Sequence, residues 1–117
     1  MRIPGISMLH DAKVCFEDAI NAAFLIQEFT KDLNFDQYEL DIKTQSAVER
    51  QFEIIGEAFN RIFKIDSELL TQITDWKDII GFRNVIIHGY DVLSTAVIWD
   101  TVCSNIPQLI KDLKPLI

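Results

Sequence analysis

The sequence has little cysteine, glycine or proline. Its two cysteines, Cys15 and Cys103, lie far apart, without the close spacing of a zinc site or a redox pair. We expect both to be buried free thiols. Four glycines provide neither a Gly-rich phosphate-binding loop nor a nucleophile elbow. No apolar run approaches the ~20 residues of a membrane-spanning helix, and a secretory signal is missing. We therefore expect no membrane association and a cytoplasmic location.

Positive charge is also scarce. Eleven Lys and Arg residues face eighteen Asp and Glu residues, which gives a formal net charge of −7. Nonspecific nucleic-acid affinity comes from cations that neutralise phosphates, so a general nucleic-acid coat is disfavoured. Any RNA site must be local, or shared with a partner. Arg50, Arg61 and Lys64 can form a positive groove if the fold gathers them.

Apolar side chains recur with the period of an α-helix. They make up 49% of 117 residues, enough to bury one core, so we expect a single domain, residues 1–117. The first stripe predicts a helix from Leu9 to Thr30; it consists of Leu9, Ala12, Phe16, Ala19, Ala23 and Ile26. The second predicts another long helix; it consists of Val48, Phe52, Ile55, Phe59 and Ile62.

Two residues mark local features, one before the second long helix and one inside it. Asp36 follows a break at 34–36 and can cap a short turn that leads into this helix. Gly56 lies inside the apolar stripe, where glycine costs about 1 kcal/mol relative to alanine. It marks either a close contact with another helix or a local kink.

The remaining chain predicts one short and two longer helices, and strand signals are weak throughout. Asp66 or Ser67 can cap the short helix. Thr74 or Asp75 can open a helix from Trp76 to His88, which ends at Gly89. Ser94 or Thr95 starts the last helix. In that last helix Pro107 predicts a kink, and Pro115 should stop it. We therefore predict an all-α protein, an antiparallel bundle of four or five helices.

The segment from Gly81 to Tyr90 carries the side chains best suited to chemistry. Arg83 offers a permanently charged fork that suits a phosphate, and His88 titrates near pH ~6.5, so it can accept or donate a proton. Asn84 and His88 share a helix face, whereas Arg83 and His88 are separated by about 140°. One copy is thus poorly arranged, and two copies that meet in a symmetric dimer offer a better cleft.

Each of these residues also has a purely structural interpretation. A histidine near a helix C-terminus often only complements the helix dipole, and Arg83 can pair with an acid such as Asp78. Asn84 can be a polar surface residue, and Tyr90 an amphipathic residue with its hydroxyl in water. Taken alone, the residues favour this interpretation.

The order and spacing of Arg83, His88 and Tyr90 resemble the Arg-X4-His-X-Tyr signature of the HepT-like proteins of the HEPN superfamily. Asn84 is the polar residue that usually follows their arginine. The signature also has a matching setting, because three segments occur in the family order, namely Thr44 to Arg50, Ile55 to Ala58, and Trp76 to Tyr90, the last of which contains the signature. The resemblance extends roughly from Leu9 to Leu113.

The resemblance implies a homodimeric helical bundle that cleaves RNA without a metal or another cofactor. It implies that Arg83 holds the phosphate, that His88 assists attack by the ribose 2′-hydroxyl, and that Asn84 orients the phosphate or His88. Tyr90 matches the tyrosine that a minimal nucleotidyltransferase antitoxin of the MntA kind modifies with AMP, which blocks RNA. The chain would then be the toxin of a toxin-antitoxin pair.

Two other functions stay open. The chain can be a noncatalytic module that presents Tyr90, or a nucleotide, to a nucleotidyltransferase. It can also be a structural dimerisation domain, although packing alone does not require the polar trio Arg83, Asn84 and His88.

Weaker candidates have structural interpretations. Glu49, Glu53 and Glu57 fall on one helical line, as acids of a metal site do, but no Glu-X-X-His pair accompanies them, so a solvated face is favoured. We expect Trp76 and Trp99, both at apolar helix positions, to lie in the core or in a dimer interface.

Overall fold

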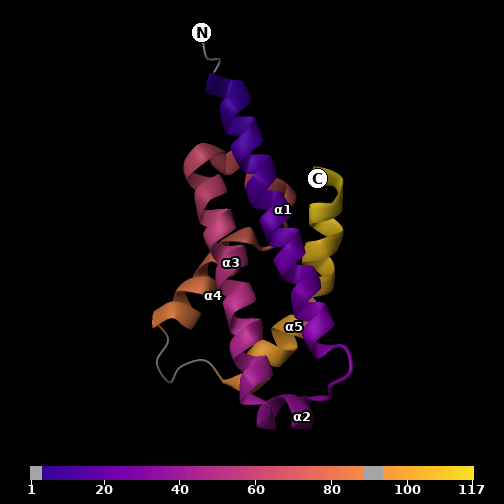
Figure 1. The fold of residues 1–117 in the computed structure, drawn as a ribbon. Coiled ribbons are helices and arrows are strands. Elements are labelled where there is room, and N and C mark those ends of the chain that lie inside the picture. Colours follow the sequence, from indigo (N-terminus) through magenta and orange to yellow (C-terminus); the bar gives the residue numbers. More distant parts are fainter. Residues whose placement is uncertain (1–3, 89–93) are drawn as a thin grey trace.

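The computed structural model describes residues 4–88 and 94–117, with side chains for residues 10–87 and 94–117. Within these ranges the chain forms five α-helices, two 3₁₀ turns and no strand. The helices are α1 (Pro4–Thr30), α2 (Phe35–Leu40), α3 (Ile42–Asp66), α4 (Trp76–His88) and α5 (Thr95–Leu113), and the turns are η1 (Ser67–Gln72) and η2 (Lys114–Leu116). The predicted all-α antiparallel bundle is confirmed (Figure 1).

The core lies where α1, α3 and α5 meet. In Figure 1, α3 runs beside α1 in the opposite direction, and these two helices make the most extensive contact. Ala19 and Ala23 on α1 are fully buried, and their small side chains let α3 approach closely. Phe59 and Ile62 of α3 are also fully buried. Each large apolar side chain contributes about 1.5–3 kcal/mol when buried, so this contact dominates the stability of the bundle.

The first helix begins earlier than predicted. It starts at Pro4 rather than at Leu9, because the apolar stripe on which the prediction rested begins only at Leu9. Proline is well suited to the first turn, where its missing amide would have no partner in the helix. At the other end, the Thr30 hydroxyl donates to the carbonyl of Ile26 at 2.8 Å, so the buried hydroxyl has a partner.

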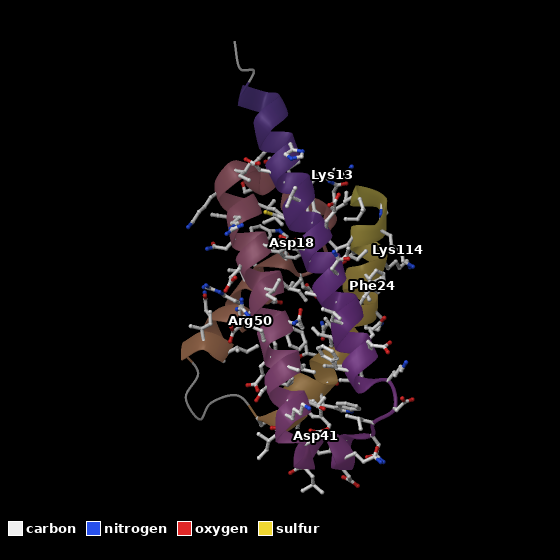
Figure 2. The ribbon with its side chains drawn as sticks, in the orientation of Figure 1. Lys13, Asp18, Phe24, Asp41, Arg50 and Lys114 are labelled. Carbon is white, nitrogen blue, oxygen red and sulfur yellow. The ribbon has the colours of Figure 1, made fainter. Side chains whose placement is uncertain are left out.

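The cap of α2 differs from the prediction, and α3 has a cap of its own. Asn34, rather than Asp36, caps α2: its Oδ1 accepts from the Gln37 amide, and the Gln37 side chain accepts from the Asn34 amide, both at 2.9 Å. Asp36 lies in the first turn instead, where its charge faces the positive end of the helix dipole. Asp41, labelled in Figure 2 at the base of α3, caps that helix and accepts from the Thr44 amide at 3.0 Å.

Two of the later caps are among those predicted, whereas Gly89 lies outside the described residues. Asp66 caps η1 and accepts from the Glu68 amide at 3.0 Å, and Ser94 caps α5. The helix α5 continues through Pro107 and ends just before Pro115, as predicted for Pro115. The kink at Pro107 stays a prediction.

One of the two cysteine predictions is wrong. Cys15 is buried, but Cys103 is exposed, because it lies about 100° around α5 from its neighbour Val102, at the margin of the buried stripe. Trp76 and Trp99 are partly buried against the core. None of the helices that the structure describes is long and apolar enough to cross a membrane.

Candidate functional site

The candidate site lies on α4, and aromatic contacts fix how α4 packs on α3. The rings of Phe52 and Phe82 meet edge to face with centroids 5.0 Å apart, and those of Phe63 and Trp76 are 5.7 Å apart. The earlier residue of α3 thus faces the later residue of α4, so the two helices are antiparallel. The C-terminal half of α4 therefore lies beside the middle and N-terminal parts of α3 (Figure 1).

Arg83 packs at the closest approach of these two helices. A Cβ built on Gly56 of α3 would overlap the Cβ and Cγ of Arg83 and would lie 3.3 Å from its Cδ. The aliphatic stem of Arg83 therefore lies directly against the α3 backbone. Of the two interpretations of Gly56, the close helix contact is the one that the structure supports.

The guanidinium of Arg83 is held on one side and has unused donors on the other. Its Nη1 donates to Oδ1 of the adjacent Asn84 at 3.0 Å. Its Nε is enclosed and has no hydrogen-bond partner among the described residues. Within the same part of the chain no carboxylate, Asp78 included, lies within ion-pair distance of Arg83. The site therefore presents a positive charge that no acid there neutralises, which suits an anionic ligand.

The structure brings Arg83 and Asn84 together but leaves the other two predicted site residues less defined. His88 is the last residue of α4, and its side chain lies outside the described part of the chain. Tyr90 also lies outside the described residues. Five helical positions separate Arg83 from His88, which is about 140° of rotation and 7.5 Å of rise.

The other candidate cations, Arg50, Arg61 and Lys64, do not all gather at one place on α3. Arg50 pairs with Glu53 at 3.1 Å and with Glu57 at 3.5 Å. Eleven positions of one helix separate Arg50 from Arg61, which is about 16 Å. In Figure 2, Arg50 lies beside the region where α3 and α4 meet. The acids that pair with Arg50 reduce its value for RNA, so Arg83 is the better anchor for a phosphate.

Burial affects an acid on the same side of α3 as Gly56. Glu49, two turns earlier in α3, is half-buried. Burial is the main cause that raises the pKa of its carboxyl, and the neighbouring Glu53 raises it further. The predicted solvated face therefore holds for Glu57 better than for Glu49.

A cavity of about 150 Å³ lies between α3, α4 and α5, and sequence reasoning missed it. Phe52, Phe82 and Ile106 contribute to its apolar lining, and Asp75 and Asp78 also line it. Two acids beside an apolar floor do not suit a phosphate. This cavity is therefore separate from the chemistry that Arg83 offers.

Comparison with known proteins identifies the family. Residues 19–116 match the family described as Ribonuclease HepT-like. The chain belongs to this HepT-like family of the HEPN superfamily. The matched range contains Arg83, Asn84, His88 and Tyr90, so the whole signature lies inside the family match.

Several relatives share nearly the full length of this HepT-like chain. A Thermococcus cleftensis protein named probable ribonuclease HepT is 38% identical over 102 residues, which are 87% of this chain and 92% of the relative. A candidate RNase of Methanocaldococcus jannaschii is 33% identical over 107 residues, 92% of this chain and 88% of that protein. A candidate RNase of Caldanaerobacter subterraneus is 34% identical over 94 residues, 80% of this chain and 82% of the relative. No solved structure matches the chain.

Proposed function

We propose that this chain is a metal-independent endoribonuclease toxin that uses Arg83 to hold the scissile phosphate. The observation that carries the proposal is the state of the Arg83 guanidinium, which Asn84 orients at 3.0 Å while no described acid neutralises it. Membership of the HepT-like family and the ribonuclease names of its relatives support the choice of RNA as substrate.

The chemistry would be an internal transfer at the phosphate. The ribose 2′-oxygen bonds to phosphorus and gives its proton to the imidazole of His88, and the P–O5′ bond breaks. The 5′-oxygen takes up a proton from water, and the imidazolium of His88 returns its own proton to the solvent. Arg83 offsets the charge that grows on the phosphate oxygens in the transition state. Asn84 orients the phosphate or His88. The products are a 2′,3′-cyclic phosphate end and a 5′-hydroxyl end.

The cleft is proposed to form between two copies of the chain. Helix geometry separates Arg83 from His88 by about 140° within one copy, so a second copy is needed to complete the arrangement. Val85 and Ile87, on the same stretch of α4, are 36% and 40% exposed. Such apolar side chains beside a polar site suit a dimer contact. An Ile87→Asp variant should be monomeric in analytical ultracentrifugation and inactive; a dimer of unchanged stability would contradict this interface.

Tyr90 is proposed to be the site of control. A minimal nucleotidyltransferase antitoxin would transfer AMP to its hydroxyl, which adds negative charge and bulk at the cleft and repels RNA. Incubation with such an enzyme and labelled ATP should label the wild type and not Tyr90→Phe. Equal labelling of both proteins would remove Tyr90 from the proposal.

The role of Arg83 is tested with a matched arginine. Arg83→Ala and Arg50→Ala each remove one positive charge from the same region, but Arg50 already pairs with two glutamates. Cleavage of a structured RNA in excess chelator should fall by roughly 100-fold or more in Arg83→Ala, the usual loss for one donor that stabilises transition-state charge. It should change only slightly in Arg50→Ala. Equal losses in both variants would mean that general charge, rather than a phosphate site at Arg83, supports the activity.

A further inference from the structure

Gly56 is the tightest point of contact between α3 and α4. The atoms that a Cβ at this position would overlap are the Cβ and Cγ of Arg83. These atoms form the root of the side chain, and its Cβ is fixed by the backbone of α4. A change of rotamer cannot move that Cβ, so any side chain at position 56 forces the two helices apart.

We propose that Gly56 is a positioning residue of the ribonuclease site, where the lack of a side chain sets the depth at which Arg83 lies against α3. This inference rests on the ribonuclease function proposed above. It extends that function to a residue on another helix that does not touch the substrate.

Two contacts fix the guanidinium when glycine is at position 56. Its stem lies against the α3 backbone, which leaves Nε enclosed. Its outer end is held by Asn84 at 3.0 Å. The direction of the remaining donors therefore follows from the approach of the two helices. A shift of α4 would displace those donors with the backbone that carries them.

Simple helix packing does not account for an arginine at this position. The neighbouring side chains of α4 that pack against the core are apolar, among them Ile79, Phe82 and Ile86. An apolar side chain at position 83 would satisfy such an interface without a buried polar atom, whereas Arg83 leaves its Nε without a partner among the described residues. A glycine at position 56 opposite an arginine at position 83 therefore favours a role in positioning the charge of Arg83.

The chain provides a matched control. Gly81 lies on α4, two residues before Arg83, and a Cβ there would meet no atom within 4 Å. Gly81→Ala and Gly56→Ala make the same chemical change in a helix, but only the second displaces Arg83. RNA cleavage is measured for both at a temperature where circular dichroism shows each variant fully folded.

We expect kcat/KM of Gly56→Ala to fall by roughly 100-fold, the loss typical of a displacement of about 1 Å at a catalytic group. Gly81→Ala should stay within about twofold of the wild type, since it displaces nothing near Arg83. A folded Gly56→Ala protein with wild-type kcat/KM would overturn the positioning role.

A thermal-unfolding cycle tests the contact without any activity measurement. It compares the wild type, Gly56→Ala, Arg83→Gly and the double variant. Alanine at position 56 should lower the Tm when Arg83 is present, because of the overlap. It should raise the Tm in the Arg83→Gly background, because alanine is the better helix former once the stem is gone. If Gly56→Ala does not fold at all, the same sign change appears as recovered folding of the double variant.

These measurements separate the two proposals. The same change of Tm in both backgrounds would show that Gly56 does not act through Arg83, and would overturn the inference even if the wild type cleaves RNA. An inactive wild type would refute the ribonuclease function and the catalytic meaning of Gly56, while the opposite signs of the Tm changes would still confirm the contact.

Discussion

Replacement of Tyr38 by phenylalanine should stabilise the protein. Tyr38 of α2 is completely buried, and its ring packs against Trp99 with centroids 5.1 Å apart. Its hydroxyl is enclosed and has no hydrogen-bond partner among the described residues. Burial, and then the nearby Glu49, raise the pKa of Tyr38 well above its usual value of 10.0. The hydroxyl is therefore neutral at any ordinary pH, and the substitution changes no charge.

The size of the effect follows from the cost of an unsatisfied group. A buried polar group without a partner costs about 1–3 kcal/mol, and phenylalanine removes this cost while it keeps the ring contact with Trp99. We expect a gain of about 1–2 kcal/mol in the free energy of unfolding. The entropy of unfolding is about 2.1 cal/mol/K per residue, or about 0.25 kcal/mol/K for 117 residues. The Tm should thus rise by roughly 4–8 °C.

Scanning calorimetry at pH 7 measures this rise, provided that unfolding is reversible. Tyr38→Leu is the matched control, since it removes the hydroxyl and also the aromatic contact; it should lower the Tm. A lower Tm for Tyr38→Phe would contradict this prediction, because it would show that the hydroxyl donates a hydrogen bond in the folded protein.

Three further predictions concern the electrostatics and the core. Burial raises the pKa of the Glu49 carboxyl in the folded protein. The protonated carboxyl therefore contributes to stability below its unfolded pKa of about 4.3, and this contribution is lost as pH rises through the folded pKa. Glu49→Gln should therefore raise the Tm at pH 7 and leave it nearly unchanged at pH 3; an equal effect at both values would contradict the raised pKa. The Thr44 hydroxyl, which donates at 2.6 Å, and the Thr44 amide lower the pKa of Asp41. The Tm of the wild type should thus exceed that of Asp41→Ala by its full amount above about pH 4, and this difference should shrink as pH falls through the lowered pKa of Asp41. A difference that does not change with pH would argue against an ionised Asp41 cap. Phe59→Ala should cost about 3–5 kcal/mol in urea titrations, whereas Phe63→Ala, at a side chain 47% exposed, should cost much less, and similar costs would contradict the described core.

Most of the fold could be predicted because helical stripes report burial directly. The stripes through Phe16 and Phe59 identified the faces of α1 and α3 that meet in the core. The cap of α2 could not be predicted, because Asn34 and Asp36 are both good capping residues and only the path of the chain selects one. Cys103 was misplaced for a similar reason. It has the right spacing for the stripe, and only the neighbouring helices decide where burial stops.

The site was predicted in part. The sequence indicated Arg83 and Asn84 as separate site residues on α4, and the structure adds that the Arg83 guanidinium donates a hydrogen bond to Asn84. It could not identify Gly56 as the partner of Arg83, because that contact depends on how two helices far apart in the sequence align. Asp78 was a plausible partner by proximity in sequence, but five helical positions place it about 140° away from Arg83. The roles of His88 and Tyr90 stay predictions.

The most direct test of the account is the chemical nature of the RNA ends that the purified protein produces in excess chelator, compared with His88→Ala prepared in the same way. We expect the wild type to leave 2′,3′-cyclic phosphate and 5′-hydroxyl ends, and the folded His88→Ala protein to leave none. Cleavage at an unchanged rate by His88→Ala, or 3′-hydroxyl and 5′-phosphate ends from the wild type, would contradict it.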